Sequence, residues 1–221
     1  MSRLEWDKTG EKLYETGVDM GVLYPKDKSG AYPTGVAWNG LTAVNESPSG
    51  AEATALYADN AKYLELISTE EFGGTIKAYM YPDEFAACDG SADLVEGIAA
   101  TQQERQHFGF CYRTLVGSDT EGTKHGYKIH IVYDAVAKPS SRDNSTVNDS
   151  PEAVTMSWEF TTTPVKVGKE GIKPTAHLII DSTKLAEEKL KKLEDVLYGD
   201  QSGTAKLPLP DEIIELINAA A

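Results

Sequence analysis

The sequence predicts a mainly β protein of the β-rich α+β class, with one β domain, an N-terminal arm and a C-terminal helical appendage. Two patterns indicate this class: apolar and polar residues alternate in several segments, and helical spacing is confined to three short ones. Composition agrees, because 40% of the 221 residues are hydrophobic and 25% are charged. The chain therefore has enough apolar residues to bury a core and is expected to fold.

Strands are predicted where the alternation has a period of two, because successive side chains of a half-buried strand point to opposite faces. In Tyr127–Tyr133 every odd position is apolar or aromatic. The same pattern is plain in three further segments, 76–81, 108–113 and 154–160, and weaker candidates bounded by Gly, Pro, Ser or Asp are 36–45, 62–68 and 177–181.

Three segments have helical features. A short helix is predicted over 82–88, where proline and two acidic residues begin the segment. The clearest helix is predicted over 182–198, with Ser182 or Thr183 as its N-terminal cap and Gly199 as its end. After a polar linker, residues 210–217 predict a second amphipathic helix whose apolar side needs a surface to pack on.

Two connections are long for a compact domain, namely 20–35 and 46–54, since the median connection is about 4 to 6 residues. Long connections usually carry function or contacts. We therefore divide the chain into an N-terminal arm (1–35), a β domain (36–181) and a C-terminal helix with its appendage (182–221).

Charge and composition exclude several classes of function. The chain carries 21 basic and 35 acidic residues, a formal net charge of −14, so it lacks the cationic face that grips duplex DNA. No apolar run approaches the roughly 20 residues of a membrane-spanning helix, and the first residues do not begin a secretory signal. In the reducing compartment that this implies, Cys88 and Cys111 are expected to be free and buried.

Motifs for catalysis, cofactors and metals are missing from the sequence. There is no nucleophile elbow, phosphate-binding glycine loop or dinucleotide fingerprint. The four histidines are scattered, and the one Glu-x-x-His spacing, Glu104 and His107, has no second copy. We therefore expect no catalytic residue, no cofactor and no metal site, and we do not expect an enzyme.

Two other features have a functional and a structural interpretation. Adjacent acids such as Glu70-Glu71 and Glu187-Glu188 could form a glycosidase pair, but a solvated face is the ordinary interpretation in so acidic a chain. Interleaved tyrosines could stack on bases or sugars, yet without basic neighbours they favour core or subunit contacts; they are Tyr79, Tyr81, Tyr112 and Tyr133.

Several phrases follow one another in an order that is typical of one family. The run from Trp38 to Glu52, WNGLTAVNESPSGAE, is the longest, and it is followed by LYADN at 56–60. With these phrases the chain resembles the major tail tube protein of long, non-contractile-tailed bacteriophages and prophages. The resemblance covers about residues 18–181 and continues at 81–85, 109–117, 148–153 and 161–164, whereas residues 199–221 match nothing in that family.

The resemblance implies a two-sheet sandwich or barrel-like tail tube fold with a flanking short helix. It implies a structural virion protein whose hexameric rings self-assemble into a stacked tube for genome ejection. The implied partners are further copies of the chain, the tape-measure protein in the lumen, the tail terminator and distal tail proteins, and DNA in transient passage. Such a protein is made and assembled in the host bacterial cytoplasm and has no membrane partner and no catalytic residues.

Ring closure followed by stacking is a head-to-tail arrangement, which needs exposed strand edges and reaching segments. We expect the connection after the 36–45 strand to contact the ring above or below and the bore of the tube to be acidic, since basic walls would trap DNA. The residues expected to make inter-ring or inter-subunit contacts are Asn45, Glu46, Ser47, Pro48, Ser49, Gly50 and Glu52.

Three alternatives stay open at this stage. A carbohydrate-binding module or tail-tip adhesin would present a platform of aromatic residues. The inner tube of a contractile injection particle would share the ring architecture and add a sheath. An acid-pair hydrolase would need two convergent carboxylates in a cleft.

Overall fold

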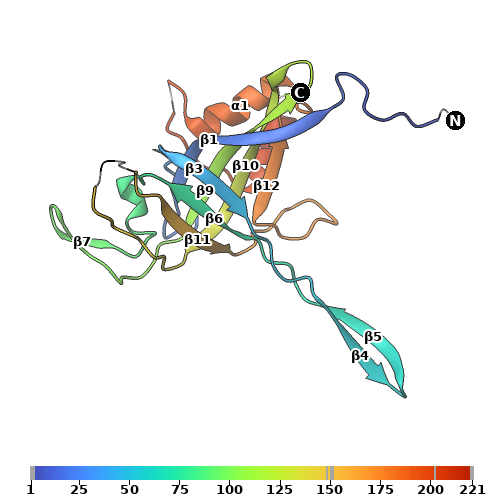
Figure 1. Cartoon of the computed structure of the whole chain (residues 1–221), viewed down its shortest axis with the longest axis horizontal. Coiled ribbons are helices and arrows are strands. Elements are labelled where there is room, and N and C mark those ends of the chain that lie inside the picture. Colours follow the sequence, from blue (N-terminus) through green and yellow to red (C-terminus); the bar gives the residue numbers. More distant parts are fainter. Residues whose placement is uncertain (1–2, 148, 150–151, 202, 220–221) are drawn as a thin grey trace.

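A computed structural model describes residues 3–147, 149, 152–201 and 203–219. Most elements of these residues are antiparallel strands, accompanied by two α-helices and one short 3-10 helix (Figure 1). The predicted β-rich α+β class is confirmed. The phrase at 148–153, which contributed to the family resemblance, lies partly outside the described residues.

One eight-stranded antiparallel sheet forms the body, in the order β2-β1-β9-β10-β11-β6-β3, with β12 also paired to β10. Figure 1 shows this sheet curling on itself, so the barrel-like description fits it. Its strands are β1 (Leu13–Pro25), β2 (Val36–Trp38), β3 (Leu41–Glu46), β6 (Gly73–Ala78), β9 (Phe108–Ser118), β10 (Gly122–Ala137), β11 (Met156–Thr162) and β12 (His177–Asp181).

The longest strand, β10, changes partners at a bend. Its residues 128–132 pair with β12, whereas 135–137 pair with β11, and the register against β9 shifts between Val132 and Ala135. Asp134 lies at this break with a positive φ of 48°. The bulge bends the strand, which lets the sheet curl.

The inner face of the curled sheet encloses an aromatic core. Strands β1 and β3, which lie second and last in the strand order, approach each other closely: a Cβ at Gly21 would collide with the Leu41 side chain. The rings in this core meet largely edge-on, a favourable geometry for aromatic pairs. Its buried Trp and Phe members are Trp38, Phe85, Phe108, Phe110, Trp158 and Phe160.

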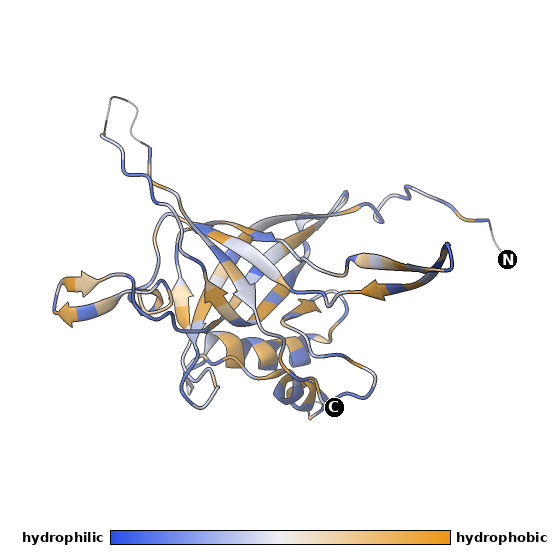
Figure 2. Ribbon diagram, turned by 90° about the horizontal axis from the view of Figure 1, so that it is seen from below, coloured by the Kyte–Doolittle hydropathy of each residue, from blue (hydrophilic) through white to orange (hydrophobic). Residues whose placement is uncertain are grey.

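Helices α1 (Glu187–Tyr198) and α2 (Pro210–Asn218) cover the outer face of the same sheet (Figure 2). Leu193 and Leu197 of α1 are fully buried against it. The Tyr24 hydroxyl of β1 donates a 2.6 Å hydrogen bond to the carbonyl of Leu197, and the Tyr133 hydroxyl donates one of 2.9 Å to that of Pro208. The C-terminal residues are thus part of a second core.

The segment expected to be an N-terminal arm contains a strand of the sheet. Residues 13–25 form strand β1, which pairs with β9 along most of its length and with β2 on its other edge. Alternation does not mark this strand, because Leu23 packs in the inner core while Val22 and Tyr24 pack in the outer one. The division into an arm, a β domain and an appendage stays a prediction.

Other predicted helix and strand boundaries differ from the observed ones for local reasons. The predicted 182–198 helix begins at Glu187, because the Asp181 carboxylate accepts hydrogen bonds from the Thr183 backbone N–H and hydroxyl and holds a turn there. The helix expected over 82–88 is a 3-10 helix at Asp83–Phe85 followed by turns. The single strand expected over 36–45 is two strands, β2 and β3, separated by a turn at Asn39 and Gly40.

Candidate subunit interface

A long β-hairpin projects from the body, on the side away from α1 (Figure 1). Its strands are β4 (Ala53–Ala58) and β5 (Ala61–Ile67), and Asp59 and Asn60 form the turn with positive φ angles. Asp and Asn tolerate this conformation better than most residues, which favours a tight turn here. A strand close to β5 was predicted from sequence at 62–68, whereas no element was predicted for most of β4.

The hairpin exposes large apolar side chains on both of its faces. In β5, alternation places Leu64 and Leu66 on one face and Tyr63 and Ile67 on the other. Leu56 of β4 pairs with Leu64 and extends the leucine face. Six large apolar side chains on the hairpin are 39 to 73% exposed, namely Leu56, Tyr57, Tyr63, Leu64, Leu66 and Ile67.

An isolated two-stranded hairpin is marginally stable in water, and contiguous exposed apolar surface marks an interaction site. A ribbon that is apolar on one face can lie on a surface, whereas a ribbon that is apolar on both faces is covered only between two surfaces. The hairpin therefore has the chemistry of a segment that inserts between partner molecules.

The predicted contact residues form the end of β3 and the stem of this hairpin. Residues Asn45 and Glu46 belong to β3, and the five others, Ser47, Pro48, Ser49, Gly50 and Glu52, lie in the stem. The stem is paired: Ser49 and Glu71 exchange backbone hydrogen bonds of 2.9 and 2.8 Å. The expected 46–54 loop is therefore an ordered ribbon, and its backbone needs Gly50, whose φ is 84°.

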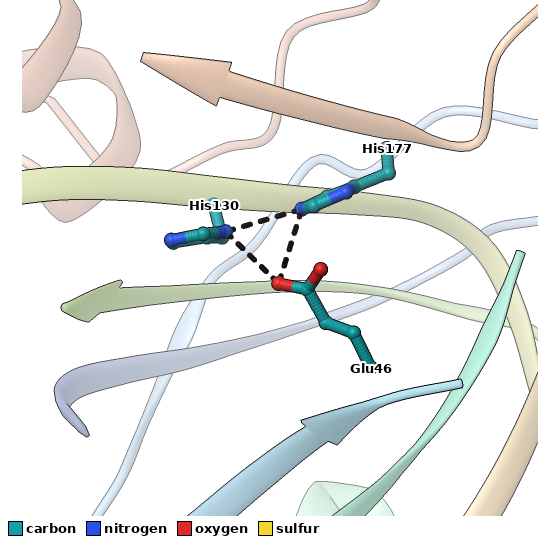
Figure 3. A group of neighbouring side chains, drawn as sticks. All are labelled: Glu46, His130 and His177. Atoms are coloured by element: carbon teal, nitrogen blue, oxygen red, sulfur yellow. Dashed lines mark hydrogen bonds and ion pairs between the residues drawn. The ribbon is translucent and has the colours of Figure 1, made fainter. Parts of the chain in front are cut away.

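The Glu46 side chain is 38% exposed but reaches toward two histidines on neighbouring strands. Its Oε1 lies 3.2 Å from Nδ1 of His130 in β10 and 3.9 Å from Nε2 of His177 in β12 (Figure 3). Those two histidine nitrogens are 3.2 Å apart. The three side chains thus converge on one point between strands β3, β10 and β12.

Aromatic neighbours fix the geometry of this cluster. The His130 ring stacks on Tyr112 with centroids 4.6 Å apart, and the His177 ring stacks on Phe72 at 4.4 Å. The Tyr112 hydroxyl donates a 2.6 Å hydrogen bond to Glu46. Burial lowers the pKa of His130 and lowers that of His177 to about 4, so both imidazoles are neutral at pH 7.

Sequence spacing could not reveal the cluster, because its members come from three strands far apart in the chain. His130 and His177 lie inside the predicted strands 127–133 and 177–181, so their strands were found but their meeting was not. The pairing of His130 with Ile179, two residues from His177, brings the histidines together. Topology supplies the cluster.

Two smaller segments also expose apolar side chains. Strands β7 (Ala92–Val95) and β8 (Ile98–Ala100) form a second hairpin, which was not predicted from sequence. It exposes Leu94, Val95 and Ile98, and Figure 2 shows its apolar residues on the far side of the body from β4 and β5. The extended N-terminal residues expose Leu4 and Trp6.

The remaining candidate residues are not brought together as a site. Tyr112 and Tyr133 are buried, so the four interleaved tyrosines do not form one exposed platform, although Tyr79 is exposed. The acidic pairs Glu70-Glu71 and Glu187-Glu188 are exposed and lie on the hairpin stem and on α1. Within the described residues, each helix is too short or too polar to cross a membrane.

No family model and no curated protein matches this chain. Among solved structures, it is similar to a chain in the cryo-EM structure of an extracellular contractile injection system, the PVC sheath-tube complex in its extended state. The identity is 12%, the match covers 73% of this chain and 88% of the other, and the TM-score is 0.31. At this TM-score the likeness carries no conclusion about function.

Proposed function

We propose that the chain is the major tail tube protein of a long, non-contractile-tailed bacteriophage or prophage. In this proposal, copies of the chain close into hexameric rings, and the rings stack into the conduit for genome delivery. The tape-measure protein occupies the lumen before ejection, and the tail terminator and distal tail proteins bind the two ends. The chain acts as a structural protein of the virion, with no catalytic residue.

The observation that carries this proposal is the β4–β5 hairpin with two apolar faces. A head-to-tail assembly needs a segment of one copy that fits a different surface of the next, and a projecting ribbon supplies it. The ordered family phrases support the same function, since the longest phrase, 38–52, ends in the stem of this hairpin.

Removing the hairpin tests the proposal directly. Ser49 and Glu71 are bridged partners, so residues 50–70 can be replaced by Asn-Gly, the two-residue turn that best joins antiparallel strands. The body should still fold, because the hairpin contributes nothing to either core. Electron microscopy should show tubes for the unaltered chain and none for the shortened chain. Normal tubes from a folded, shortened chain would remove the proposal.

The net charge of −14 suits a conduit for DNA. Basic residues on the wall would release counterions and hold DNA with salt-dependent affinity, whereas an acidic wall repels it. We propose that the bore carries more Asp and Glu than Lys and Arg. Assembled tubes should not bind duplex DNA at low salt, and a strongly positive bore in a tube structure would contradict this.

A further inference from the structure

The Glu46, His130 and His177 atoms are spaced like the ligands of one metal ion. Three atoms separated by 3.2, 3.2 and 3.9 Å have a common point about 2.0 Å from each, the bond length of zinc to imidazole nitrogen and carboxylate oxygen. Two of the sides, each 3.2 Å, are close to the separation of roughly 3.4 Å between neighbouring ligands in a tetrahedral zinc site, and the third, 3.9 Å, would have to shorten slightly.

Hydrogen bonds around the cluster aim a lone pair of His130 at that point. The Thr114 hydroxyl donates its proton to Glu15 (2.7 Å), because a carboxylate only accepts. The Thr114 oxygen, 3.1 Å from Nε2 of His130, therefore accepts from the Nε2–H group. In the neutral imidazole this leaves Nδ1 unprotonated.

Two electron-rich atoms then face each other across 3.2 Å, namely His130 Nδ1 and Glu46 Oε1. The Tyr112 proton already occupies one lone pair of that Glu46 oxygen. The His130 and His177 side chains are only 5% and 11% exposed, although that of Glu46 is 38% exposed, and a cation between the two atoms would make the arrangement favourable. His177 Nε2 offers a third lone pair in the tautomer that is protonated at Nδ1.

The surroundings also resemble the outer shell of a metal site. Ligating histidines usually donate their second N–H to a hydroxyl, carbonyl or carboxylate, as His130 does to Thr114, and ligating carboxylates accept a further hydrogen bond, as Glu46 does from Tyr112. Stacking on Tyr112 and Phe72 holds both imidazole rings in place. The ligands therefore need little rearrangement to bind an ion.

We propose that Glu46, His130 and His177 bind one divalent transition-metal ion, with Zn²⁺ as the ion that the two-nitrogen, one-oxygen set fits best. The site is structural. Glu46 ends β3 immediately before the hairpin stem, and Phe72 ends the stem on its return. A bound ion would clamp the root of the hairpin to β10 and β12 and so fix the direction in which the ribbon projects.

The experiment uses the untagged full chain, stripped with a chelator and then titrated with Zn²⁺ alone. Calorimetry and elemental analysis should give one Zn²⁺ per chain, and Co²⁺ as a substitute should give the absorption bands of a four-coordinate site. Zn²⁺ at 100 times its Kd should raise the folding equilibrium constant about 100-fold. Binding is measured on the subunit, so the result does not depend on tube assembly.

Matched variants locate the ion. Glu46→Gln and His177→Gln should abolish the stoichiometric site, whereas His125→Gln should keep it, because His125 of β10 pairs instead with Glu121, just before that strand. Tyr112→Phe removes one hydroxyl and should weaken binding about 10- to 100-fold. Circular dichroism checks folding, and Tyr112→Phe gives the answer if a ligand variant does not fold. A folded wild-type chain that binds no Zn²⁺, or ligand and Tyr112→Phe variants that bind it with unchanged affinity, would overturn the proposal.

Discussion

Asp134 shows how one residue fixes the course of the longest strand. Its positive φ bends β10 where the strand passes from β12 to β11. Its carboxylate binds both Lys26 Nζ and His107 Nδ1 at 2.7 Å, and its backbone N–H donates to the Tyr32 hydroxyl at 3.1 Å. The bend of the strand and these side-chain contacts therefore meet at the same residue.

Replacing Asp134 by Ala should lower the free energy of unfolding by about 2 kcal/mol or more, since alanine tolerates the left-handed conformation poorly and Lys26 loses its partner. Asn keeps the size and the tolerance for positive φ, so Asp134→Asn should cost clearly less. Urea unfolding of both variants measures the difference. Equal losses would show that the backbone conformation contributes nothing.

The thiols of Cys88 and Cys111 show how burial changes the pKa of single residues. Both cysteines are free and buried, which confirms the expectation from sequence. Burial raises the pKa of Cys88 and that of Cys111 to about 12. The folded chain thus retains two thiol protons that the unfolded chain releases above about pH 8.5.

This difference sets the direction of the pH dependence. Because the folded state binds more protons between pH 8.5 and about 12, stability should fall as the pH rises through that interval. A thiol-specific reagent at pH 8 should label neither cysteine in the folded chain and both in urea. Rapid labelling of the native chain at pH 8 would contradict the burial of these thiols.

At the scale of elements, helix α1 closes the outer core. Leu193 is fully buried between α1 and the sheet, whereas its neighbour Lys192 is exposed. Leu193→Ala should cost about 2 to 5 kcal/mol of stability through the cavity it leaves, and Lys192→Ala should stay within about 0.5 kcal/mol of the unaltered chain. Thermal or urea unfolding compares the two. A small loss at Leu193 would mean that α1 does not cover the sheet.

The β4–β5 hairpin should contribute to assembly and not to the stability of the subunit, because its apolar residues have nothing to pack on within the subunit. Leu66→Ser should leave the stability of the isolated subunit nearly unchanged. It should raise the critical concentration for assembly about tenfold or more, because this fold-change corresponds to the free energy of burying one leucine side chain. Lys192→Ser, at an exposed position of α1 outside the hairpin, is the control and should assemble normally. Sedimentation velocity measures both. Equal assembly by the two variants would exclude the leucine face as a contact.

At the scale of the whole molecule, the way each strand is buried explains which strands could be predicted from sequence. Strand β12 was predicted with its observed bounds, and the cores of β9 and β10 were found, because their apolar residues alternate or cluster between clear turn residues. β1 escaped prediction because both of its faces are covered over residues 21–24 and both are exposed over residues 13–17, and β4 because both of its faces are largely exposed. Alternation reports a strand only where its two faces differ.

The candidate sites follow the same logic. The predicted contact residues were placed in a loop because Ser, Pro and Gly dominate them, whereas the structure pairs them into a stem. The cluster of Glu46, His130 and His177 depends on three strands meeting, which no local pattern encodes. The exposed hairpin surface is likewise defined by what the fold leaves uncovered.

Self-association around an open axis is the central claim, and electron microscopy of the purified full-length chain at high concentration tests it most directly. The account predicts hollow tubes of stacked rings in which each β4–β5 hairpin is enclosed by neighbouring copies. A chain that stays monomeric at the highest concentration reached, or that forms particles without an axial channel, would contradict it.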